Sequence, residues 1–241
     1  MPSEKCPICH DTGWVIYNFP FGHRLFGQAV PCKCKRAEIA QKRAARLREM
    51  SNIGDISFWT FDSFYPEKCI ARKDFKTGPG IMQALKAKLS EWAEKPEGWV
   101  ILEGPPGTGK THLAYAVANK ALANNVPCYI DTMPDILDLL RAGYKDDSYE
   151  ARFQTMCKVG LLIIDDLGVQ KESDWTSEKL YQLVNYRYSH RSPMMITTNK
   201  NLEESRIDPR IVSRLLDGIH RDDGWVKKYR TPVGDYRKGV K

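Results

Sequence analysis

The chain has 241 residues, of which 42% are hydrophobic and 28% charged, and it carries a formal net charge of +7. This length allows one sizeable core with a small appendage, or two modest domains. No apolar run approaches the roughly 20 residues of a membrane-spanning helix, and no apolar signal stretch opens the sequence, so we expect a cytoplasmic protein without membrane contact.

The first predicted element is a metal-binding segment within residues 1–34. Its four candidate zinc ligands are Cys6, Cys9, Cys32 and Cys34. Disulfides are rare in the cytoplasm, and two cysteine pairs brought together across a loop form a tetrahedral Cys₄ site, so we expect Zn²⁺ here. His10 or His23 could replace one cysteine, and reduced unbound cysteines or a redox pair are the alternatives. Because the segment contains little apolar material, zinc would supply its folding free energy.

A basic linker follows this segment. Residues 35–50 are strong helix formers without Gly or Pro and predict a helix. Between Lys33 and Arg48 there are seven Lys or Arg residues against one acid, Glu38. The aromatic-rich residues 51–67 end this helix.

The rest of the chain alternates helical patterns with short apolar runs. The predicted strands are 98–104, 126–131, 160–168 and 193–199. The predicted helices are 68–94 with an interruption near 77–80, 111–125, 134–144, 149–158, 176–191 and 208–218. This alternation predicts an α/β fold with a parallel sheet and helices on both faces.

GPPGTGKT, residues 104–111, fits the phosphate-loop pattern G-x-x-x-x-G-K-T. It follows a predicted strand and opens a predicted helix, a context in which backbone N–H groups surround phosphate oxygens. Lys110 is expected to reach the β- and γ-phosphates, and Thr111 to offer its hydroxyl to Mg²⁺. The residues expected to contact ATP are Gly104, Pro105, Pro106, Gly107, Thr108, Gly109, Lys110, Thr111, His112 and Phe61.

Two further strand ends carry polar residues suited to nucleotide hydrolysis. In LLIIDDLG, Asp165 follows four apolar residues and is expected to hold Mg²⁺, while Asp166 orients and activates the attacking water. Asn199 ends the last predicted strand and is expected to position water near the γ-phosphate. Each feature alone also fits turn or capping chemistry, and the phosphate loop upstream favours catalysis.

Arg210 and Arg214 lie four residues apart on one face of the last predicted helix. Either fits an arginine finger that reaches the γ-phosphate of a neighbouring subunit, or an exposed helix arginine. The candidates for contact with single-stranded DNA are Arg141, Tyr144, Lys145, Lys227, Lys228 and Arg230. Each of these also fits a solvated basic surface.

In this order, GPPGTGKT, LLIIDDLG, ITTN and RIVSRL resemble the motifs of an AAA+ ATPase, and more narrowly the DnaC/DnaI type of bacterial and phage replicative helicase loaders. FWTFDSF, TPVGDYR and the cysteine-bearing N-terminus match the same group. The resemblance implies a zinc-binding N-terminal domain with its basic linker over residues 1–50, which grips the hexameric replicative helicase. It implies an AAA+ P-loop ATPase domain over residues 51–241.

The same resemblance implies a mechanism. ATP lies between self-associating subunits, Asn199 matches the first sensor, and Arg214, with Arg210 as the second choice, acts in trans. The expected function is ATP-dependent loading of the helicase onto single-stranded DNA.

Two departures from the family pattern matter. The second acid is Asp166 where many AAA+ proteins have Glu, and only residues 217–241 follow SRLL, which indicates a truncated lid. We therefore expect slow ATP hydrolysis that DNA or a partner stimulates. The alternative functions are an IstB-type transposition ATPase that delivers target DNA to a transposase, and a zinc module with a degenerate ATPase half.

Overall fold

The computed structural model describes residues 6–24, 26–36, 58–69, 78–170, 173–217 and 224–235. The chain divides into two compact units, residues 1–47 and 48–241. Beyond residue 36, the expected basic linker helix lies outside the described residues. Within the described residues, no helix is long and apolar enough to cross a membrane.

The first unit is built around a short antiparallel hairpin. Strand β1 (Trp14–Ile16) pairs with β2 (Ala29–Pro31). The amide of Cys32 donates to the carbonyl of Gly13 over 2.9 Å, which joins the chain after β2 to the chain before β1. The hairpin therefore brings the two ends of a long loop together.

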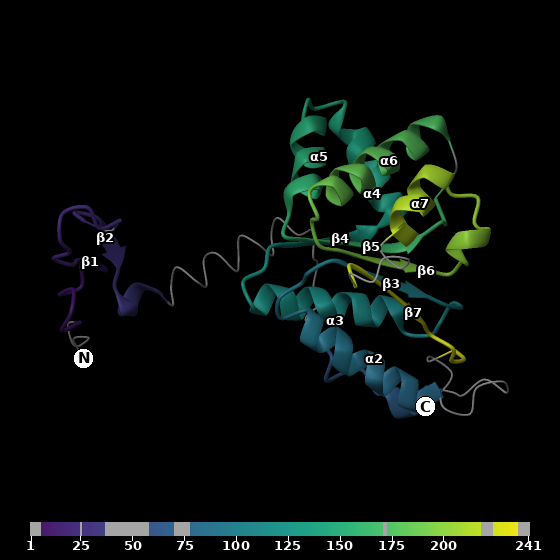
Figure 1. Cartoon of the computed structure of the whole chain (residues 1–241), viewed down its shortest axis with the longest axis horizontal. Coiled ribbons are helices and arrows are strands. Elements are labelled where there is room, and N and C mark those ends of the chain that lie inside the picture. The colour runs from purple at the N-terminus through teal and green to yellow at the C-terminus, as the bar shows by residue number, and fades with distance from the viewer. Residues whose placement is uncertain are drawn as a thin grey trace. The chain divides into compact units, whose positions relative to one another are not determined.

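The second unit contains a five-stranded parallel sheet in the order β4-β5-β6-β3-β7 (Figure 1). Its strands are β3 (Trp99–Glu103), β4 (Cys128–Thr132), β5 (Leu161–Leu167), β6 (Met194–Thr198) and β7 (Val226–Arg230). Every residue of β3 and β6 is buried, as expected for strands covered on both faces. Because all strands are parallel, their carboxyl ends meet at one edge of the sheet.

Helices cover both faces of this sheet (Figure 1). They are α2 (Gly78–Trp92), α3 (Lys110–Ala123), α4 (Met133–Gly143), α5 (Tyr149–Lys158), α6 (Asp174–Ser189) and α7 (Pro209–Asp217). Two short 3-10 helices are η1 (Pro66–Lys68) and η2 (Leu202–Glu204). Helices α2 and α3 lie on one side of the sheet, and α4, α6 and α7 on the other. The predicted α/β fold is confirmed.

A buried arginine joins three of these elements. The side chain of Arg187, on α6, is fully buried and donates to the carbonyls of Met156, Cys157 and Val159 over 2.8, 3.0 and 3.1 Å, and also to that of Pro193. The first three carbonyls belong to the end of α5, where helix carbonyls have no partner within the helix. Burial lowers the pKa of Arg187 to about 10. This guanidinium therefore caps α5 and fastens it to α6 and to the start of β6.

Two predictions about elements were wrong. The interruption expected near residues 77–80 is the beginning of α2, because Gly78–Gly80 form its first turn, where a proline removes no helix hydrogen bond. No strand was predicted after the last helix, yet residues 226–230 form β7. Its charges hid the strand, because β7 is an edge strand that pairs with β3 alone among the described strands.

Candidate nucleotide-binding site

The phosphate loop lies where the sequence predicted it, between the end of β3 and the start of α3. Gly107 and Gly109 have φ angles of 79° and 87°, which side chains rarely adopt. A Cβ on Gly109 would lie 2.6 Å from the ring of Phe64, so the glycine also permits close packing. The loop is therefore shaped by its glycines and backed by an aromatic residue from the segment before α2.

Lys110 is held inside this loop. Its ammonium donates to the carbonyls of Gly104 and Pro105, each over 2.8 Å, and to Oδ1 of Asn199 over 2.7 Å. Burial lowers the pKa of Lys110 to about 8. The side chain thus rests on neutral oxygens that phosphate oxygens can replace.

The acidic pair ends at the same edge. Asp165 is buried and accepts hydrogen bonds from the hydroxyls of Thr111 and Thr197 over 2.9 and 2.5 Å. Burial raises the pKa of this carboxyl. Asp166 has a φ of 57°, where the register of β5 against β6 is irregular, and its carboxylate accepts from Nδ2 of Asn199. As a result, the carboxylates of Asp165 and Asp166 have different partners, Thr111 and Thr197 for the first and Asn199 for the second.

The structure therefore brings together five residues that the sequence singled out. They are Lys110, Thr111, Asp165, Asp166 and Asn199. Asn199 connects them, because its oxygen accepts from the lysine and its nitrogen donates to the second acid.

The segment before α2 packs on the start of α3. The imidazole Nε2 of His112 lies 3.1 Å from the hydroxyl of Ser63 and 3.0 Å from the carbonyl of Thr60. Burial lowers the pKa of His112. Phe61, from the same segment, is also buried, whereas His112 belongs to the first turn of α3.

The chain after β7 also packs on the phosphate loop, which sequence reasoning missed. The hydroxyls of Thr231 and Thr108 lie 2.8 Å apart, and the amide of Thr231 donates to the carbonyl of Glu103 over 2.9 Å. A Cβ on Gly104 would lie 2.1 Å from that threonine hydroxyl, and one on Gly107 would lie 2.3 Å from Oδ1 of Asp235. The sequence signal was the resemblance of TPVGDYR to the family's C-terminal motif.

An ion network centred on the buried Glu103 ties the same elements together. The carboxylate of Glu103 lies 3.0 Å from the ammonium of Lys228 and 3.3 Å from Nε of Arg230, and accepts from the amide of Leu202 over 3.4 Å. Lys228 also pairs with Glu203 over 3.3 Å. The side chain of Lys228 is 11% exposed, so this DNA candidate instead joins β7 to β3 and η2.

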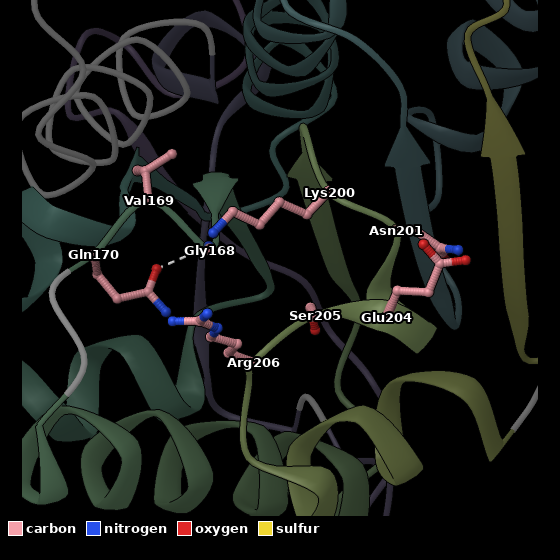
Figure 2. Close-up of a pocket in the computed structure, with 8 residues that line it drawn as sticks. All are labelled: Gly168, Val169, Gln170, Lys200, Asn201, Glu204, Ser205 and Arg206. Carbon is pink, nitrogen blue, oxygen red and sulfur yellow. Dashed lines mark hydrogen bonds between the residues drawn. The ribbon is translucent and has the colours of Figure 1, made fainter.

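A polar pocket of about 820 Å³ adjoins this site (Figure 2). Its lining residues are Gly168, Val169, Gln170, Lys200, Asn201, Glu204, Ser205 and Arg206. The amide of Gly168 donates to Oε1 of Gln170 over 2.8 Å, and the Gln170 side chain extends toward Arg206. The two lining loops continue directly from Asp166 and Asn199, so a group that enters the pocket contacts the chain next to these residues.

Arg210 and Arg214 lie on α7 and contact α6. Nε of Arg214 donates to Oδ1 of Asn185 over 2.8 Å, and Nη2 donates to the hydroxyl of Tyr181 over 3.0 Å. Arg210 pairs with the carboxylate of Asp208 over 2.7 Å. Both predicted arginines are therefore held within their own subunit.

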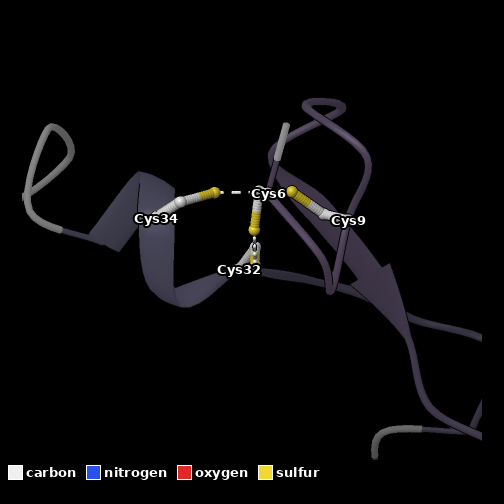
Figure 3. A group of neighbouring side chains, drawn as sticks. All are labelled: Cys6, Cys9, Cys32 and Cys34. Atoms are coloured by element: carbon white, nitrogen blue, oxygen red, sulfur yellow. Dashed lines mark hydrogen bonds between the residues drawn. The ribbon is translucent and has the colours of Figure 1, made fainter. Parts of the chain in front are cut away.

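The four N-terminal cysteines converge (Figure 3). Their sulfur atoms all lie within 4.8 Å of one another, with 3.8 Å between Cys6 and Cys32 and 3.4 Å between Cys9 and Cys34. A tetrahedral zinc with Zn–S bonds of about 2.3 Å places its sulfurs about 3.8 Å apart. This arrangement fits Zn²⁺ with four thiolates and uses neither of the alternative histidines.

An aromatic and basic cluster joins α4, α5 and α6, and we name it the Tyr144 cluster. It consists of Arg141, Tyr144, Tyr149, Trp175 and Lys179. The rings of Tyr144 and Tyr149 are stacked with centroids 4.4 Å apart. The guanidinium of Arg141 lies 4.8 Å from the centre of the Trp175 ring. Sequence reasoning found Arg141 and Tyr144 but missed the residues that only the fold brings beside them.

The parallel sheet, the phosphate loop after β3 and the acidic pair at the end of β5 define a P-loop ATPase of the AAA+ type. Residues 36–226 match the family model described as the IstB-like ATP binding protein, and the chain belongs to that family. Solved structures share the fold. The crystal structure of the DnaC helicase loader matches with a TM-score of 0.56 and 20% identity, covering 73% of this chain and 98% of that one.

Two relatives point to different roles within the family. A Geobacillus stearothermophilus protein named for ATP binding in insertion sequence IS5376 is 29% identical over 201 residues, 82% of this chain and 76% of that protein. The replicative helicase loader DnaC of Escherichia coli (strain K12) is 34% identical over 146 residues, 58% of this chain and 59% of the loader. The match thus spans less than two thirds of the loader.

Proposed function

We propose that this chain hydrolyses ATP with the residues gathered around Asn199. Lys110 exchanges its loop carbonyls for the β- and γ-phosphates, where its charge is stabilising. The hydroxyl of Thr111 and the carboxylate of Asp165, already 2.9 Å apart, are the oxygen ligands that would hold Mg²⁺. That ion would neutralise phosphate charge. Asp166 orients the attacking water, and Asn199 positions it at the γ-phosphate.

We propose that Arg214 completes this site in a second copy of the chain, with Arg210 as the second choice. A cation at the γ-phosphate stabilises the charge that develops in phosphoryl transfer, typically by a factor of about 10³ or more. The test mixes Lys110→Ala subunits, which lack a working site, with Arg214→Ala subunits, which lack the cation. Each variant alone should be inactive, and the mixture should hydrolyse ATP. An inactive mixture contradicts action in trans.

We propose that the Tyr144 cluster contacts single-stranded DNA. Aromatic rings stack on bases of any sequence, and neighbouring cations attract the phosphate backbone. Tyr144 is 53% exposed, and its aromatic neighbours Trp175 and Tyr149 contact the cationic side chains of Arg141 and Lys179. Tyr144→Ala should weaken binding of an oligothymidine by about 1–3 kcal/mol, while ATP binding stays unchanged.

We propose that the chain loads a replicative helicase onto single-stranded DNA. The observation that carries this proposal is the four-cysteine cluster, which builds a separate compact unit suited to gripping a partner. Exposed Ile16 and Phe21 on the hairpin and its loop offer that unit an apolar contact surface. Delivery of target DNA to a transposase is the second candidate, which the similarity to the IS5376 protein favours.

One binding experiment separates these two functions. The full chain and its Cys9→Ser variant are each mixed with the purified helicase and with the purified transposase from the same genome. We expect the intact chain to retain the helicase, and the variant to lose it while still binding ATP. Retention of the transposase instead contradicts the loader function.

A further inference from the structure

Helix α6 presents one aromatic ring to both arginines of α7. The guanidinium carbon of Arg210 lies 4.4 Å from the centre of the Tyr181 ring, and that of Arg214 lies 4.7 Å from it. The two arginines project from the same side of α7 because they are four residues apart. The face of a tyrosine ring attracts cations, so Tyr181 holds both side chains against α6.

Hydrogen bonds fix Arg214 in the same place. Nε donates to Asn185, Nη2 to the hydroxyl of Tyr181 over 3.0 Å, and Nη1 to the carbonyl of Arg210 over 2.9 Å. A guanidinium carries five N–H groups, two of them on each Nη. These three bonds use the Nε hydrogen and one hydrogen on each Nη, so the second N–H of each Nη can donate to a phosphate.

Charge distinguishes the two arginines. The Nε and Nη2 groups of Arg210 donate to the carboxylate of Asp208 over 3.1 and 2.7 Å, and the negative charge of that carboxylate balances the charge of the guanidinium. The three acceptors around Arg214 are an amide, a phenol and a backbone carbonyl, all uncharged. These contacts orient Arg214 while leaving its positive charge for a phosphate.

We propose that Tyr181 is a positioning residue for the arginine that acts in trans. Its ring and hydroxyl hold Arg214 in one geometry before the second copy docks. The long side chain then loses little freedom when it meets the γ-phosphate. This inference rests on the proposed role of Arg214, and Tyr181 itself acts through that arginine.

The test uses the mixture of Lys110→Ala and Arg214→Ala subunits as its reference. Tyr181→Leu is added to the Lys110→Ala subunit, which supplies the arginine. Tyr181→Leu removes the cation–π contact and the hydrogen bond to Arg214, and the cation–π contact alone predicts an ATP turnover at least about fivefold below the reference. Tyr181→Phe keeps the ring but loses the hydroxyl that accepts from Nη2 of Arg214, so its turnover should lie between that of Tyr181→Leu and the reference. Tyr186→Leu, at another α6 tyrosine that stacks on His190, is the matched control and should match the reference.

A second arrangement separates positioning from general damage to the fold. Tyr181→Leu is placed in the Arg214→Ala subunit instead, where its own arginine is already absent. We expect the full reference rate, because that subunit supplies only its nucleotide site. Turnover lowered equally in both arrangements, or unchanged in both, overturns the inference. If the reference mixture is inactive, the trans role of Arg214 fails and the inference falls with it.

Discussion

The pKa of Lys110 makes nucleotide binding depend on pH in a predictable way. Burial lowers this pKa to about 8 in the protein alone, so about a tenth of the Lys110 side chains are neutral at pH 7 and about nine tenths at pH 9. Phosphate oxygens favour the charged form, which keeps the bound lysine protonated over this range. Binding must therefore recharge Lys110 at high pH, and affinity should fall about tenfold, or about 1.4 kcal/mol, between pH 7 and pH 9.

Calorimetry of a non-hydrolysable ATP analogue with Mg²⁺ measures this effect directly. Titrations in two buffers with different ionisation enthalpies give the number of protons taken up on binding. We expect about 0.1 proton at pH 7 and about 0.5 at pH 8. Burial lowers the pKa of His112, so that neighbour stays neutral throughout this range.

A matched variant provides the control. Arginine keeps its charge at every pH used here, so any binding that Lys110→Arg retains should show no proton uptake from this position. Uptake near zero at pH 8 in the unaltered protein, or an affinity that does not change up to pH 9, would refute the reasoning.

Three further predictions concern stability and packing. Arg187→Leu leaves the carbonyls at the end of α5 without donors and should lower the free energy of unfolding by about 3–5 kcal/mol in urea titrations. Metal analysis should find about one zinc per chain. The Cys9→Ser variant should lose this zinc, its NMR spectrum should show the first unit unfolded, and its ATP binding should persist. Gly104→Ala should weaken ATP binding in a fluorescence titration, because the new Cβ meets Thr231. Gly80→Ala has open space around its Cβ and should leave the affinity unchanged in that titration.

The nucleotide-binding site could be predicted from local sequence patterns. A phosphate loop needs a strand before it and a helix after it, and both were readable around GPPGTGKT. Parallel strands bring their carboxyl ends together, so Asp165 and Asn199 could be expected beside Lys110 without any knowledge of their separation.

Features that depend on partners distant in sequence were not readable. Lys228 looked like a free basic residue, and its burial follows from Glu103, which lies on a neighbouring strand. No pattern in the sequence distinguishes Arg187 from other helix arginines, and only the fold places the end of α5 around it. Trp175 and Tyr149 likewise contact the ring of Tyr144 only because the fold brings their helices together. In each case the decisive contact joins two elements that no local pattern relates.

The two hydrogen bonds of Asn199 connect the phosphate loop to Asp166 and to the chain that follows β6. Any ligand that draws Lys110 away also releases the oxygen of this amide, at the point where β6 ends and the chain runs to η2. Glu103 anchors η2 to β7, and the chain after β7 returns to the phosphate loop at Thr231. These contacts form a closed path that starts at the phosphate loop and returns to it, so the position of the edge strand β7 is tied to that of the loop.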